Sequence, residues 1–216
     1  MLVLNATLKD WYRDSLGTKI YSEAGSLPAS NARWVHIDPV QLVLQPGETK
    51  EVSVSMQVPG DPKPVTNSML FLTQVNQRRP VTGIDKAGKK VGIIIKVEVG
   101  IHLYNTIPGI SKKNLEFTAF EDKGRNSDST RLLAVAIQNK GDVATDGQLR
   151  VELTNKTSGA TVTIRPKAIS MLPGATQIVY VNVPAHLQKG NYQAAAILDS
   201  GPATDLKVAQ KDIVYE

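Results

Sequence analysis

The sequence has no cysteine, few aromatic residues and no long apolar segment. Without cysteine, the chain cannot form a disulfide framework, a thiolate metal site or a cysteine nucleophile. Aromatic residues make up 5% of the 216 residues and apolar residues 41%, so the core is expected to consist mainly of Val, Ile, Leu and Ala. No apolar run reaches the roughly 18 residues of a membrane-spanning helix, and none is predicted.

The excess of positive charge is small, and it is concentrated in one place. The chain has 25 Lys and Arg against 20 Asp and Glu, and a net charge of +5 does not by itself indicate a nucleic-acid partner. Residues 78–96 alone carry an excess as large as that of the whole protein. We interpret this stretch as a solvated loop, with steering of an acidic partner as the functional alternative. Its charged residues are Arg78, Arg79, Asp85, Lys86, Lys89, Lys90 and Lys96.

Apolar residues recur mostly with a period of two. This alternation predicts strands with one buried face and one wet face, and no convincing amphipathic helix is found. Turn signals rich in Pro and Gly separate the runs at short spacing, which predicts an all-β chain of sandwich type. The clearest alternating runs are residues 52–56, 97–103, 149–153 and 179–183.

A weak internal repeat predicts two domains. Pro46-Gly47 and Pro173-Gly174 each turn the chain before an alternating strand, 127 residues apart. Tyr192 lies in a Gly-x-Tyr strand that is typical of immunoglobulin-like sandwiches. We therefore predict two tandem immunoglobulin-like β-sandwich domains, residues 1–107 and 108–216.

Residues with reactive side chains form no catalytic or metal-binding motif. His36, His102 and His186 are far apart, and none has a histidine or carboxylate at ligand spacing. The sequence contains no Gly-x-Ser-x-Gly elbow, phosphate-binding glycine loop or zinc-protease helix. No metal or cofactor is predicted, and two sandwiches of this size are expected to be a non-enzymatic binding protein.

The first half resembles the periplasmic pilus-chaperone family. Residues 2–11 look like that family's third strand, residues 17–20 like the following turn, residues 34–48 like its leucine-rich segment ending in Pro-Gly, and residues 101–108 like its last strand. The resemblance implies two immunoglobulin-like domains, a periplasmic or cell-surface location and capture of a protein subunit by strand addition. The second half is similar to the immunoglobulin-like modules that follow such domains, with Asn139-Lys140-Gly141 in the position of a hairpin.

The chain departs from the family pattern in two respects. The family begins with a signal peptide and two further strands, and neither has a counterpart before residues 2–11. A misplaced start, a shortened chain and completion by another chain all remain open, and the last of these implies a homodimer through an incomplete first sandwich. The family's carboxylate-anchoring Arg also has no match, and its Lys aligns with His102, which is mostly neutral at pH 7.

Two interpretations of the run before His102 remain open. The resemblance implies that Ile93, Ile95 and Val97 form an edge strand whose alternate apolar side chains fill a partner's groove. The alternative is a buried core strand of the same domain, because Ile93-Ile94-Ile95 is apolar on both faces.

Aromatic residues near the start offer a different function. Trp11, Tyr12 and Trp34 could stack on sugar rings, which would make the protein a surface module that binds glycan or peptidoglycan. The alternative is that Trp11 and Trp34 fill a core that has few other large side chains.

Overall fold

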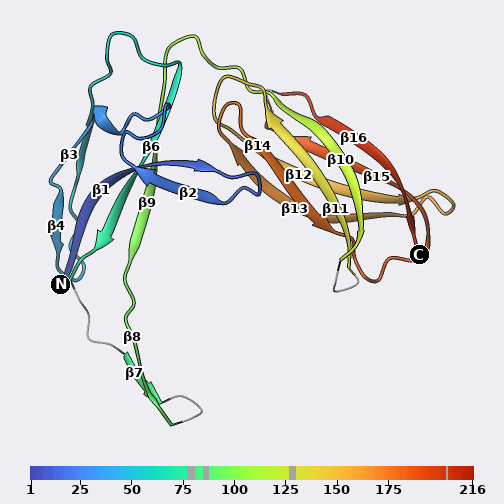
Figure 1. Ribbon diagram of the computed structural model, residues 1–216, viewed down its shortest axis with the longest axis horizontal. Helices are drawn as coiled ribbons and strands as arrows, with labels where there is room; N and C mark the ends of the chain where they lie inside the picture. The colour runs from blue at the N-terminus through green and yellow to red at the C-terminus, as the bar shows by residue number, and fades with distance from the viewer. Residues whose placement is uncertain (77–80, 85–87, 127–129, 203) are drawn as a thin grey trace. The chain divides into compact units, whose positions relative to one another are not determined.

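The computed structural model of the chain consists of antiparallel β-strands (Figure 1). It describes residues 1–76, 81–84, 88–126, 130–202 and 204–216. Within these residues the helical structure is a single 3₁₀ turn, Ala32–Trp34, and no described helix is long and apolar enough to cross a membrane. The predicted all-β class is therefore confirmed.

The chain divides into two compact units. The first consists of Met1–Trp11 and Tyr21–Ile107, and the second of Tyr12–Ile20 and Pro108–Glu216. The predicted domains, residues 1–107 and 108–216, stay a prediction; the contacts of the chain group Tyr12–Ile20 with the second unit. This segment forms the tip of the hairpin that joins β1 to β2, and its turn at residues 17–20 was expected from the sequence, but its grouping with the second unit was not.

The first unit contains one large sheet and two small ones. The large sheet has the order β2-β1-β6-β9, with β4 also paired to β1, while β3 pairs with β5 and β7 with β8. The nine strands are β1 (Leu2–Arg13), β2 (Lys19–Glu23), β3 (Val35–Asp38), β4 (Gln41–Leu44), β5 (Ser53–Met56), β6 (Val65–Gln74), β7 (Val81–Ile84), β8 (Lys90–Ile93) and β9 (Glu98–Thr106).

The second unit contains two sheets around one apolar core. One sheet has the order β10-β11-β14 and the other β13-β12-β15-β16. Inward residues of both sheets, such as Leu133 and Leu153 at 0% exposure, form a single buried cluster. The strands are β10 (Leu115–Arg125), β11 (Arg131–Asn139), β12 (Thr145–Asn155), β13 (Thr161–Met171), β14 (Thr176–Asn182), β15 (Gly190–Asp199) and β16 (Lys207–Tyr215).

Charged groups hold the edge of the second unit's core together. Arg131 on β11 binds the Asp122 carboxylate on β10 and donates to the Val214 carbonyl on β16. Burial alone would raise the pKa of Asp122, but the hydrogen bonds from Arg131 and from the Gly124 N–H outweigh it, and the pKa is lowered. This pair therefore stabilises the unit above the unfolded pKa of the carboxyl, and the contribution is lost as the pH falls through the lowered value.

Four strands of the first unit's main sheet follow the same order as the main sheet of the second unit. The order is β2-β1-β6-β9 in the first unit and β13-β12-β15-β16 in the second. In both units a hairpin of two consecutive strands pairs, through its first strand, with the first of two strands that come later in the chain. The Pro-Gly repeat precedes β5 in the first unit and β14 in the second. One difference is β4, which pairs with β1 and has no equivalent in the second unit's four-stranded sheet. The other is the opposing sheet, which has three strands in the second unit, whereas β3 and β5 form a pair of four-residue strands in the first.

The buried core reflects this difference. Among the described residues, 8 of 28 buried hydrophobic side chains lie in the first unit and 20 in the second. Counterparts of β10 and β11 are not found among the described residues of the first unit. The main sheet of the first unit is therefore only partly covered.

Candidate partner-binding surface

Strand β9 lies at the end of the first unit's main sheet, next to β6 (Figure 1). The Gln74 N–H of β6 donates to the Val97 carbonyl at 2.8 Å, and the Val97 N–H donates to the Gln74 side-chain Oε1 at 3.2 Å. Because backbone hydrogen bonds alternate along an antiparallel strand, Val99 and Ile101 also turn their N–H and C=O groups to β6. Glu98 and Gly100 consequently turn theirs toward the outer edge of the sheet.

A row of apolar side chains follows this edge. Val99 lies opposite Leu72 and Ile101 opposite Leu70 in the sheet, so they share the face on which Leu70 is buried. Val99 and Ile101 are nevertheless 49% and 44% exposed. Val97 and Ile95, which continue the spacing toward the N-terminus, are 44% and 66% exposed. We call Ile95, Val97, Val99 and Ile101 the apolar stripe.

The second unit shows what covers this face when the opposing sheet is larger. Its last strand, β16, places Ile213 opposite Tyr192, and Ile213 is 3% exposed. There β10 contacts β16 and closes the side of the core. In the first unit Ile37 of β3 is buried, but Val54 on the same face of β5 is 44% exposed. The apolar stripe is thus exposed because no described strand occupies the place that β10 takes in the second unit.

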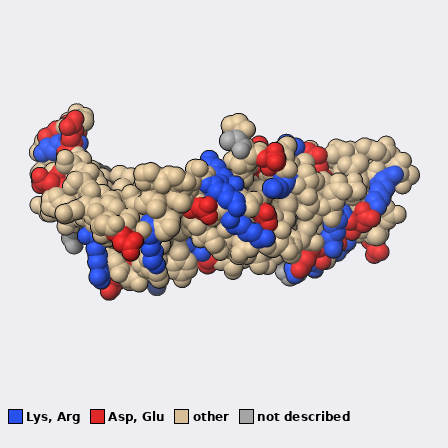
Figure 2. Space-filling model, turned by 90° about the horizontal axis from the view of Figure 1, so that it is seen from above, with Lys and Arg blue, Asp and Glu red and all other residues tan. Residues whose placement is uncertain are grey.

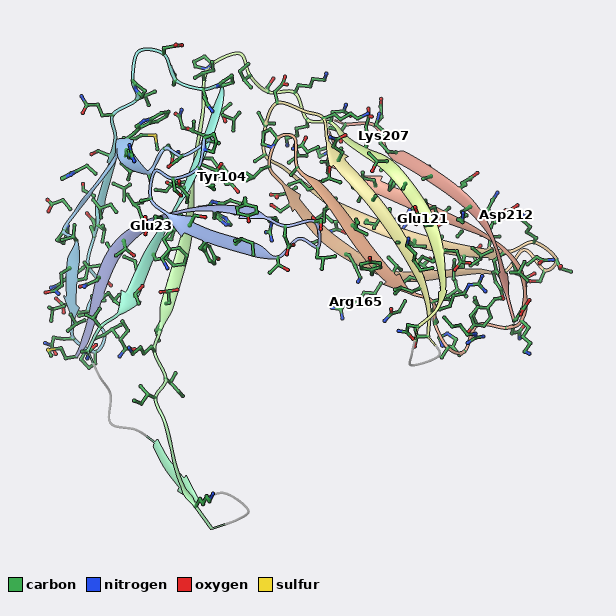
Figure 3. All side chains as sticks on the ribbon, viewed as in Figure 1. Glu23, Tyr104, Glu121, Arg165, Lys207 and Asp212 are labelled. Atoms are coloured by element: carbon green, nitrogen blue, oxygen red, sulfur yellow. The ribbon has the colours of Figure 1, made fainter. Side chains whose placement is uncertain are left out.

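The other face of β9 is packed by aromatic rings. His102 stacks on Trp11 with ring centroids 4.6 Å apart, and Tyr104 (labelled in Figure 3) meets Trp11 edge-on at 6.1 Å. A Cβ on Gly100 would lie 2.3 Å from the Met69 Cε, so the strand runs close to β6 side chains here. His102 therefore faces away from the apolar stripe, and the structure does not bring it together with Ile95 and Val97.

The predicted donor residues lie just before β9 rather than within it. Ile95 and Val97 belong to an exposed segment between β8 and β9, so the alternative of a buried core strand is not observed for them. The backbone of Ile93 ends β8, but its side chain lies outside the described residues. Val99 and Ile101 were not predicted as site residues, although the alternation over residues 97–103 was a usable signal.

The basic cluster is described only in part. Lys89 and Lys96 are exposed, while Arg78, Arg79, Asp85 and Lys86 and the side chain of Lys90 lie outside the described residues. Basic and acidic side chains both occur along the length of the face shown in Figure 2. The steering role predicted for this cluster stays a prediction.

The aromatic residues predicted to stack on sugars do not form one surface. Trp11 is 1% exposed and donates from its indole N–H to the Ser68 carbonyl, so its ring has no face for a sugar, which corrects that expectation. Tyr12 is 43% exposed but groups with the second unit. Trp34 is half-buried beside a hollow of about 700 Å³ whose other lining residues include Arg33, His36, Ser55 and Gln57.

No metal centre emerges from the residues that the structure describes. None of their His, Asp and Glu side chains gather in a group of three or more that could hold an ion.

Comparisons with known proteins add little. No family model matches the chain, and no curated protein matches it. Among solved structures, the crystal structure of DesR, a β-glucosidase from Streptomyces venezuelae in complex with D-glucose, matches 47% of this chain at 18% identity and a TM-score of 0.36. The match spans 15% of that chain, and a likeness at this level carries no argument about function.

Proposed function

We propose that the protein is a non-enzymatic chaperone or assembly module that captures an extended segment of a pilus or surface subunit by β-strand addition. The observation that carries the proposal is the edge of β9, where outward-facing backbone groups at Glu98 and Gly100 accompany an exposed apolar stripe. The sequence resemblance also favours this function, and it implies a location in the periplasm or at the cell surface, which we include in the proposal.

The topology supports an immunoglobulin-like assignment for both units. The second unit divides seven strands between two sheets in the way such domains do. Its Tyr192 hydroxyl donates to the Gln188 carbonyl at 2.8 Å, which matches the tyrosine corner of that fold. The first unit repeats the order of the main sheet, so we assign it as an immunoglobulin-like sandwich with an incomplete opposing sheet.

Strand addition would both pair the outward-facing backbone groups of this edge and cover its apolar side chains. A partner strand beside β9 would hydrogen-bond to the backbone groups of Glu98 and Gly100, and its alternate apolar side chains would pack on the stripe. Burial of each large apolar side chain is worth about 1.5–3 kcal/mol before the cost of ordering the partner is deducted. The chemistry therefore favours a partner segment with apolar residues at every second position.

The direct test is binding of a synthetic peptide that alternates Val and Thr, measured by fluorescence anisotropy in dilute solution. Ile95→Asp should weaken binding at least tenfold, because a partner strand would desolvate the new carboxylate. It should leave folding unchanged, since Ile95 is 66% exposed. Val97→Asp should behave in the same way.

Val208→Asp is the matched control, because Val208 is an exposed valine on β16, the end strand of the second unit. It should bind the peptide as the parent chain does. Equal affinity of all variants would refute capture at this edge. Unfolding by Ile95→Asp, seen as a shifted tryptophan-fluorescence midpoint, would show that Ile95 belongs to a core.

A glycan-binding module is the second candidate, and the hollow beside Trp34 favours it. An indole next to Arg33, His36, Ser55 and Gln57 combines a stacking face with hydrogen-bonding groups. Quenching of tryptophan fluorescence by cell-wall fragments, lost in Trp34→Ala, would support this function over strand capture.

A further inference from the structure

We propose that the β9 edge pairs with a second copy of this chain, in an antiparallel arrangement with its twofold axis at Val97. The proposal concerns the same edge as the proposed function, but it does not depend on the identity of a subunit partner. The paired segment would run from Ile94 to Gly100 in both copies.

Backbone geometry limits the registers that are available. Groups at Glu98 and Gly100 face outward, whereas Val97, Val99 and Ile101 face β6. In a symmetric antiparallel pair, outward-facing residues must oppose outward-facing residues, so the axis must pass through a residue and not between two. A register centred on Val97 obeys this rule.

Charge selects among the remaining registers. With the axis at Val97, Lys96 of each copy lies directly opposite Glu98 of the other, which gives two opposite-charge pairs. The Thr73 hydroxyl donates to the Glu98 Oε2 at 2.7 Å and fixes the carboxylate on that face. An axis at Glu98 would instead oppose the two Glu98 carboxylates, and an axis at Val99 would pair Lys96 with His102.

The same register pairs the apolar stripe with itself. Ile95 of each copy would lie opposite Val99 of the other, and the two Val97 residues would face each other at the axis. These side chains are 44–66% exposed in the single chain, and the interface is isologous, so it closes at two copies. The dimer would shield the stripe until a partner segment displaces the second copy.

The central contact can be tested by disulfide formation. Val97 residues at the axis form a non-hydrogen-bonded pair with Cα atoms about 4.5 Å apart, which lies within disulfide range. The chain has no cysteine, so Val97→Cys introduces a single thiol. Mild oxidation should convert Val97→Cys to a covalent dimer at least tenfold faster than Val99→Cys, whose predicted partner is Ile95 of the other copy.

The charge pairs can be tested by sedimentation equilibrium. Lys96→Glu and Glu98→Lys should each weaken the dimer about tenfold, because each creates two like-charge pairs, and the double exchange Lys96→Glu with Glu98→Lys should restore it. Lys63→Glu, at an exposed residue before β6, makes the same charge change away from the interface and should have no effect.

A parent chain that stays monomeric up to about 100 µM would overturn the proposal, since a specific interface should be populated there. A dimer that is insensitive to both charge reversals, or equal oxidation of the two cysteine variants, would also overturn it by indicating a different interface. A monomer that binds the Val-Thr peptide would refute the dimer and leave strand capture intact. A dimer with the predicted register that binds no peptide would support the dimer and refute strand capture.

Discussion

Replacement of Asp10 with alanine should destabilise the first unit by about 3 kcal/mol, because it leaves two hydrogen-bond donors without an acceptor. Asp10 is 0% exposed, and its Oδ2 and Oδ1 accept hydrogen bonds from the Leu27 N–H at 2.7 Å and the Ser30 hydroxyl at 2.5 Å. Ser30 in turn forms a bridge with Asn67 of β6. The carboxylate therefore ties the loop before β3 to two strands of the main sheet.

Tryptophan fluorescence during urea unfolding measures this effect selectively. The chain has two tryptophans, and both Trp11 and Trp34 lie in the first unit. Asp10→Asn, which keeps one acceptor oxygen, should show an intermediate loss, and Asp61→Ala, at an exposed loop residue, should show almost none. An unchanged midpoint in Asp10→Ala would contradict the anchoring role of this carboxylate.

Asn139→Ala should have an effect of similar size, about 3 kcal/mol, on the second unit. Asn139 is 0% exposed, and its Nδ2 donates to the carbonyls of Val143 and Met171 at 2.9 and 3.0 Å. Its Oδ1 accepts from the Gly141 N–H at 2.9 Å. One side chain thus satisfies three backbone groups at the end of β11, two of them in fully buried hydrogen bonds, and all three lose their partner in alanine.

Far-ultraviolet circular dichroism should record this loss as an earlier unfolding of the second unit, while the tryptophan-fluorescence midpoint stays in place. Asn182→Ala, an exposed asparagine on β14, is the matched control and should change neither signal appreciably. Coincident shifts of both signals in Asn139→Ala would show that the two units do not unfold independently.

Alternating sequence was the most reliable guide to the fold. The predicted run at residues 149–153 lies entirely within β12. Each of the other three extends one residue beyond its strand: 52–56 matches β5, 97–103 matches β9 and 179–183 matches β14. Strand β6 was missed because its central residues are buried on both faces, which removes the alternation. Local sequence also gave no sign that Asp10 would be buried, since its partners Leu27 and Ser30 lie 17 and 20 residues away.

The binding surface could be predicted only in outline. The resemblance predicted Ile95 and Val97 as residues of the binding strand. Whether their side chains are exposed depends on which strands lie opposite β9, and the arrangement of those strands is a property of the whole unit. Apolar residues alternate in the same way in β9, where Val99 and Ile101 are exposed, and in β16, whose inward face is covered by the opposing sheet. Only the comparison of the two opposing sheets distinguishes the two cases.

Amide hydrogen exchange on β9 tests the central claim most directly. In dilute solution, the amides of Val99 and Ile101 should be protected by β6, while those of Glu98 and Gly100 should exchange quickly and become protected when the Val-Thr peptide is added. Slow exchange at Glu98 and Gly100 at every concentration, with no change on adding peptide, would mean that the edge is already closed and would contradict strand capture.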